Sequence, residues 1–136
     1  MAHAAPRRLS FRSTSTWLAV LAATVFFGLG LRAVLAPATA SAFFGVPLDG
    51  GDGLAFVQAF GARNIGLSLV ALALIALDAR AGLVAVFFAA AVIAGLDFVV
   101  VSRHAGTFHG AKHLGYVALL AGFGAWFARA CGREAR

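Results

Sequence analysis

The hydrophobic pattern of this chain consists of long apolar runs separated by short polar or turn-forming stretches. The runs cover residues 17–36, 54–77, 82–102 and 110–128. Each is near the length of about 20 residues that crosses a bilayer as a helix. The short polar link Asp78-Ala79-Arg80 follows the second run and is separated from the third by one alanine, so those two helices must be antiparallel neighbours. The pattern predicts an all-α membrane protein with the fold of a four-helix transmembrane bundle.

The basic residues predict how this bundle is oriented. One face of the predicted bundle holds Arg7, Arg8, Arg12, Arg80, Arg129, Arg133 and Arg136, and the other holds Arg103 and Lys112. Because positive charge concentrates on the cytoplasmic side, both termini are expected there. The chain then divides into a basic cytoplasmic segment (1–15), a transmembrane domain (16–128) and a basic cytoplasmic tail (129–136), in what we expect to be a bacterial cytoplasmic membrane.

The first run has an alternative interpretation as a secretory signal. Two arginines precede it, and the small residues Ala38 to Ala42 follow it, which is the layout of a cleaved signal. The run is longer than the usual apolar segment of about 7–15 residues, and it contains Arg32. We therefore expect an uncleaved first helix, and signal cleavage remains the alternative.

Composition narrows the class of protein. Hydrophobic residues make up 62% of the 136 positions, against about 45–50% in soluble domains. The net charge of +6 is concentrated at the two ends of the chain. That distribution favours contact with the lipid bilayer and gives no support to nucleic-acid binding. Cys131 is the single cysteine, so no intramolecular disulfide can form.

Five polar residues interrupt the apolar runs: Arg32, Arg63, Asn64, Asp97 and His113. A helical rise of about 1.5 Å per residue places them all in the outer half of the bundle. A charge inside hydrocarbon is costly and normally finds a partner. The sequence therefore predicts a polar cluster with Arg63 in direct contact with Asp97. Such a pair could serve only to fix helix register, or it could form part of a binding or catalytic site.

Other chemistry has weak support in the sequence. His109 and His113 share one helical face and could bind a metal together with Asp97, but no cysteine or His-Glu-x-x-His pattern accompanies them, so we expect no metal site. No nucleophile–base arrangement or phosphate-binding loop is visible. Several small-x-x-x-small patterns, including Ala62 to Gly66 and Ala118 to Gly122, and the Gly28-x-Gly30 pair predict close helix packing.

Several short motifs together resemble a known family. They are Pro37, Phe44-Gly45-Val46-Pro47, Gly61-Ala62-Arg63-Asn64-Ile65-Gly66, Asp97 and His113. Between residues 17 and 127 the chain resembles small DoxX-like bacterial membrane proteins, in particular those of the domain of unknown function 4267. The resemblance implies a four-helix membrane protein in which Arg63, Asp97 and His113 are the matching polar positions, with the first helix retained. It implies no activity.

Three functions remain open on the sequence alone. The first is a non-enzymatic accessory or interaction subunit, with a homo-oligomer or another membrane protein as partner. The second is a binder or enzyme for a lipid- or quinone-like anionic molecule, held by Arg32 and Arg63 with Asp97 and His113 available for proton exchange. The third is a subunit of an oligomeric transporter. The cofactor, if one is used, is unknown. Apolar packing around Arg63 and Asp97 would favour the first, and a pocket walled by His113 would favour the second.

Overall fold

The computed structural model describes the backbone of residues 14–134 and the side chains of residues 14–129. The basic segment before residue 14, and Cys131 and the two last arginines of the tail, lie outside the described side chains. The described part is helical, with no strand. Its helices are α1 (Thr14–Leu35), α2 (Pro37–Phe44), α3 (Asp52–Ala76), α4 (Arg80–Ala105) and α5 (Thr107–Glu134). Each of the four predicted apolar ranges lies on one of the long helices.

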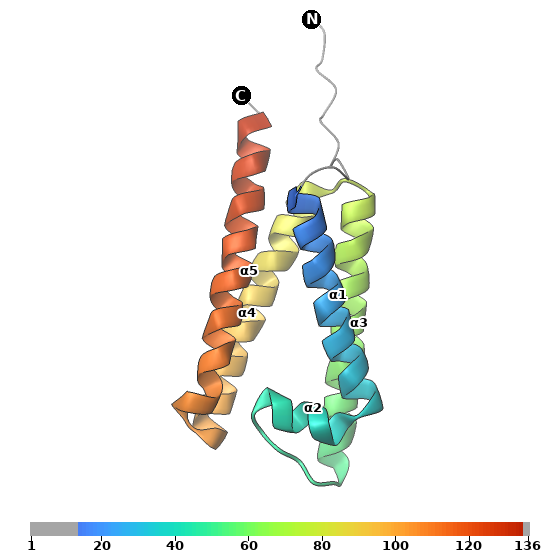
Figure 1. Cartoon of the computed structure of the whole chain (residues 1–136), viewed down its shortest axis with the longest axis vertical. Coiled ribbons are helices and arrows are strands. Elements are labelled where there is room, and N and C mark those ends of the chain that lie inside the picture. Colours follow the sequence, from blue (N-terminus) through green and yellow to red (C-terminus); the bar gives the residue numbers. More distant parts are fainter. Residues whose placement is uncertain (1–13, 135–136) are drawn as a thin grey trace, which may run out of the picture.

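The long helices form two pairs, with α1 beside α3 and α4 beside α5. Figure 1 shows the two pairs close together near the α3–α4 turn and diverging toward the other end, where α2 lies across the molecule. We call that second end the α2 end. Both described chain ends lie opposite it (Figure 1). Contact between the pairs is far smaller than contact within them, so the bundle is two helical pairs joined mainly at one end.

The sequence around Pro37, between the first two predicted apolar runs, forms a short helix that the sequence analysis did not predict. Pro37 is at the start of α2, a position that needs no backbone N–H and suits its fixed φ. Gly45 ends the helix with φ 112°, and its N–H donates to the carbonyl of Ser41 at 3.1 Å. A left-handed backbone conformation at the end of a helix favours glycine, which has no Cβ. The proline thus begins a transverse helix instead of only ending α1.

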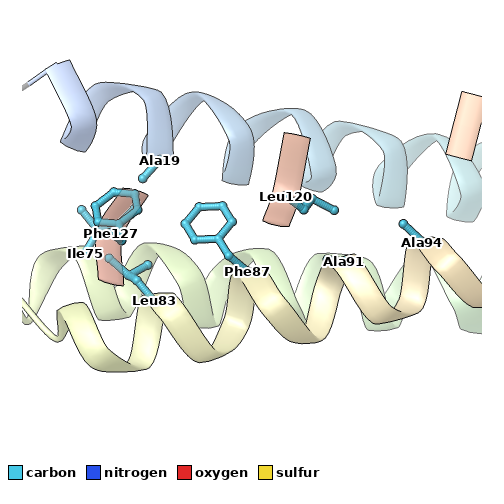
Figure 2. Close-up of a cluster of buried hydrophobic side chains, with 8 residues drawn as sticks. All are labelled: Ala19, Ile75, Leu83, Phe87, Ala91, Ala94, Leu120 and Phe127. Atoms are coloured by element: carbon cyan, nitrogen blue, oxygen red, sulfur yellow. The ribbon is translucent and has the colours of Figure 1, made fainter. Parts of the chain in front are cut away.

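A buried apolar core joins the pairs at the end opposite α2 (Figure 2). Its members are Ala19, Ile75, Leu83, Phe87, Ala91, Ala94, Leu120 and Phe127, contributed by all four long helices. The rings of Phe87 and Phe127 stack with centroids 5.7 Å apart, and Leu83 is fully buried. Large and small residues alternate here, which lets the four helices approach each other closely.

Two glycines set the distance between α1 and α3. A Cβ on Gly30 would lie 2.7 Å from the carbonyl oxygen of Gly61, and a Cβ on Gly61 would lie 2.6 Å from that of Gly30. The predicted small-residue packing is therefore correct at Gly30. It is wrong at Gly66 and Gly122, where an added Cβ would meet nothing within 4 Å. Only the glycines that face a neighbouring helix serve helix packing.

The helices are suited to a membrane. Those long and apolar enough to cross it, among the described residues, are α1, α3 and α4. Large apolar side chains such as Leu21 and Leu96 are exposed on the outside of the bundle, at 59% and 61%. This identifies a multi-pass membrane protein. The fourth predicted span corresponds to α5, which is not among the three candidates, so the four-span bundle stays a prediction.

Candidate functional site

A cavity of about 480 Å³ lies between the two helical pairs. All five helices contribute to its wall, because the pairs diverge toward the α2 end and α2 crosses the space between them. Its volume is within the range of about 300–1,000 Å³ usual for small-molecule sites. The cavity therefore lies where the two helical pairs diverge in Figure 1.

Most of this cavity is apolar. On α1 its lining runs from Ala19 to Ala33, which at the helical rise corresponds to a length of about 20 Å. The wall includes the aromatic rings of Phe26, Phe60 and Phe87, each from a different helix. A long, narrow apolar space of this kind is suited to an alkyl chain or an apolar ring system.

Most polar residues of the lining lie in the half of the cavity nearer α2. They are Arg32, Asp97, His104, Lys112, His113 and Tyr116, with Ser41 from α2 itself, whereas Asn64 lies at the middle of α3 and Ser68 one turn further toward the α3–α4 turn. The set contains four of the five residues predicted to form the polar cluster. The structure thus brings Arg32, Asn64, Asp97 and His113 into one cavity wall.

Arg63 is the exception, and its predicted contact with Asp97 is not formed. Arg63 is exposed and is absent from the cavity wall. Among the described residues the ion pair found joins Arg80 to Asp78, at 3.4 Å in the α3–α4 turn. Successive helical residues differ by about 100° in direction, and in α3 it is Asn64 that faces the cavity. The depth of a residue along a helix does not fix the direction of its side chain.

His113 is held firmly in the wall. It is only 3% exposed, and its Nε2 donates to the backbone carbonyl of Phe44 at 3.1 Å. Because a carbonyl can only accept, Nε2 carries the proton. The imidazole also makes edge-on contacts with the rings of Phe44 and Tyr116, at centroid distances of 5.0 and 5.8 Å. These contacts position His113 and join α5 to α2.

Asp97 is half-buried in the cavity wall. Within the described part of the chain its carboxylate has neither a hydrogen bond nor an ion pair, although it interacts electrostatically with His113. The side chain of Asn64 lies in the same wall, and its backbone carbonyl accepts a 2.8 Å hydrogen bond from the hydroxyl of Ser68. The cavity thus has a carboxylate that is available to a bound molecule.

Two cations surround Phe43 at the α2 end. The guanidinium of Arg32 lies 5.0 Å from the ring centroid of Phe43, and the ammonium of Lys112 lies 5.2 Å from it. Lys112 also donates to the backbone carbonyl of Phe43, while Arg32 donates to that of Thr39 at 3.4 Å. Attraction to the electron-rich ring face stabilises both cations near this position.

Lys112, His104 and Phe43 were not among the predicted site residues. The adjacency of Lys112 to His113 was a usable signal, but the position of Phe43 depends on α2, which the sequence analysis did not identify. His109 is exposed, whereas His113 is buried, so the two histidines do not share a site. The described residues contain no group of three or more His, Cys, Asp or Glu that could hold a metal ion.

Comparison with known proteins assigns this chain to a family. Comparisons with curated proteins and with solved structures each gave no match. A family model, described as a domain of unknown function (DUF4267), matches residues 23–127. That range includes the whole cavity wall except Ala19 and Ala22. The chain belongs to the DUF4267 family of proteins with a domain of unknown function.

Proposed function

We propose that this protein binds a lipid- or quinone-like molecule in the cavity between its two helical pairs. The observation that carries the proposal is the cavity of about 480 Å³, with a long apolar part and a polar end walled by His113 and Asp97. Such a hollow is what separates a ligand-binding protein from an accessory subunit packed tightly throughout. Few convergent polar groups in an apolar space are typical of small-molecule sites.

The same cavity gives less support to transport. Toward the end opposite α2 its lining becomes apolar, with Ala19, Ala22 and Ala23 on α1. A path for a polar substrate would need polar groups along its whole length. We therefore favour a molecule that is bound from the bilayer and retained over one that passes through.

The proposed setting is a bilayer crossed by four helices, with α5 as the fourth. Its 28 residues correspond to about 42 Å of helix, and it packs along α4. With four spans both termini lie on one side, as the ends of the described chain do in Figure 1. The basic residues near those ends favour the cytoplasmic side. We also propose that this protein is related to the small DoxX-like membrane proteins.

Native mass spectrometry of the protein purified in mild detergent tests the binding function. We expect an additional mass, released and identified after solvent extraction. Ala90 lines the cavity, whereas its neighbour Ala89 is exposed and does not. Ala90→Phe should therefore reduce the bound mass several-fold, while Ala89→Phe should leave it unchanged. Equal loss or equal retention in the two variants would contradict binding in this cavity.

Arg63 favours a second candidate function, that of an interaction subunit. It is exposed near the middle of α3, where a bilayer would surround it with hydrocarbon. A charge there is costly unless a partner covers it, so another membrane-embedded chain would lie against this face of α3. Arg63→Leu should then dissociate an oligomer or complex in native mass spectrometry, and Arg103→Leu should not. An unchanged complex in Arg63→Leu would contradict this function.

A further inference from the structure

The chemistry of the α2 end selects among the ligands that the cavity can hold. We propose that Arg32 and Lys112 bind the anionic head of a single-chain amphiphile, a carboxylate or phosphate, whose alkyl chain occupies the apolar part of the cavity. This inference rests on the proposed binding function and adds the class of the ligand. It assigns the two cations beside Phe43 a role in recognition, and it excludes Arg63 from that role because Arg63 does not line the cavity.

Both cations have hydrogen-bond donors to spare. Within the described residues, Lys112 uses one of its three donors on the carbonyl of Phe43. Arg32 uses one of its five on the carbonyl of Thr39, at a long 3.4 Å. Both side chains are exposed at the α2 end of the cavity, so an anion can reach them. A carboxylate or phosphate offers the acceptors that such donors bind most strongly.

The charge of the lining also favours an anion at this end. Asp97 is the only carboxylate among the described lining residues, whereas two lining residues, Arg32 and Lys112, carry full positive charges. Asp49 and Asp52, which are near the α2 end in sequence, do not line the cavity. One anionic group beside Phe43 would balance the remaining positive charge.

The order of polar and apolar groups along the cavity matches a lipid-like orientation. The cations lie near the C-terminal end of α1 and the N-terminal end of α5, where these helices reach a membrane surface. From there the apolar lining continues along α1 for about 20 Å. A head at the surface with its chain toward the bilayer centre can exchange with the surrounding lipid without turning over.

The size and lining of the space suit an alkyl chain. A volume of about 480 Å³ is that of a small-molecule site, and its lining includes the apolar rings of Phe26, Phe60 and Phe87. A quinone head would lack the negative charge that Arg32 and Lys112 recognise. The geometry therefore points to a molecule of the fatty-acid or alkyl-phosphate type.

Matched probes of equal chain length test the inference. Palmitate and hexadecanol differ at the head, and their binding to the purified full-length protein can be titrated by native mass spectrometry. The test variant is Arg32→Gln with Lys112→Gln, in which glutamine can still donate to the Phe43 carbonyl. Arg103→Gln is the control, because Arg103 is exposed but does not line the cavity. Thermal unfolding in detergent establishes that each variant is folded.

We expect the wild-type protein and Arg103→Gln to bind palmitate more tightly than hexadecanol. The double variant should bind palmitate about tenfold or more weakly, the factor expected from losing charge-assisted hydrogen bonds, with hexadecanol binding unchanged. Palmitate binding that is unaffected, or that falls equally with hexadecanol binding, would overturn the assignment of the head site. Binding of inorganic phosphate without retention of palmitate would overturn it in favour of a free-anion site.

A further variant separates failure of this inference from failure of the proposed function. Suppose that Ala90→Phe abolishes binding of both probes, while the double variant binds palmitate and hexadecanol as the wild-type protein does. The ligand then occupies the cavity, and only the assignment of the head site is wrong. If the wild-type protein binds neither probe better than Ala90→Phe does, both proposals are wrong.

Discussion

The imidazole of His113 donates through Nε2 to the backbone carbonyl of Phe44, 69 residues earlier in the chain, at 3.1 Å. This hydrogen bond joins α5 to α2 across the α2 end, where the two helical pairs otherwise diverge. The adjacent bond from Lys112 to Phe43 joins the same two helices. Together these two bonds help to hold α2 over the cavity.

We expect His113→Leu to lower the free energy of unfolding by about 1–3 kcal/mol, because the part-buried hydrogen bond from His113 to the carbonyl of Phe44 is lost. His113→Gln should lose less, since an amide N–H can replace Nε2. His109→Leu is the control, because His109 is exposed. The measurement is thermal unfolding in detergent. Equal stability of His113→Leu and His109→Leu would contradict a structural role for this bond.

The contact between Gly30 and Gly61 predicts a strong effect of adding a single methyl group. Gly30→Ala would bring a Cβ to within 2.7 Å of the Gly61 carbonyl, so α1 and α3 must move apart. Overpacking of this kind costs about 1–3 kcal/mol. Gly28→Ala, where an added Cβ meets nothing within 4 Å, should be neutral or slightly stabilising. The measurement is the midpoint of thermal unfolding in detergent. Equal midpoints for Gly30→Ala and Gly28→Ala would contradict the close approach of α1 and α3 at Gly30.

The positions of Arg63 and Asp97 predict that these residues act independently. Since Arg63 is exposed and does not line the cavity, Arg63→Gln and Asp97→Asn should show a coupling energy below about 0.5 kcal/mol in a double-mutant cycle. A buried ion pair would instead lose about 3–5 kcal/mol when either partner was removed. Coupling of that size, measured by thermal unfolding, would require a different orientation of α3.

The topology prediction can be tested by labelling single cysteines in a Cys131→Ser background. Asp49→Cys and Thr107→Cys, both at the α2 end, should react with a membrane-impermeant maleimide from outside the cell. Ala128→Cys, toward the opposite end of α5, should react only after the membrane is permeabilised. Labelling of all three from the same side would show that α5 does not cross the bilayer.

Much of the fold follows from the apolar runs, because helix length and hydropathy are properties of local sequence. Helix α2 was missed for a physical reason. Its eight residues are stabilised by the contacts of Phe44 with His113 and with Phe60, which come from other helices and leave no periodic signal in so short a segment.

The candidate site was predictable to the extent that depth determines it. Counting residues along each run placed Arg32, Asn64, Asp97 and His113 in the same half of the bundle, and all four line the cavity. The choice between Arg63 and Asn64 depends on how α3 is rotated, and Gly61 determines that rotation by facing α1. A small-residue pattern identifies such a contact only once its partner helix is known. The role of Phe43 requires α2 and could not be found from the four runs, whereas the adjacency of Lys112 to His113 was a usable signal.

Fluorescence quenching by a brominated fatty acid tests most directly whether the cavity holds an amphiphile. With Trp17 and Trp126 replaced by Phe, one tryptophan is introduced at Phe60, which lines the cavity, or at Leu69, which is on the same helix, exposed and outside the lining. We predict saturable quenching of Phe60→Trp that palmitate reverses, and only gradual, non-saturable quenching of Leu69→Trp. Identical quenching curves for the two variants would contradict a ligand-binding cavity between the helical pairs.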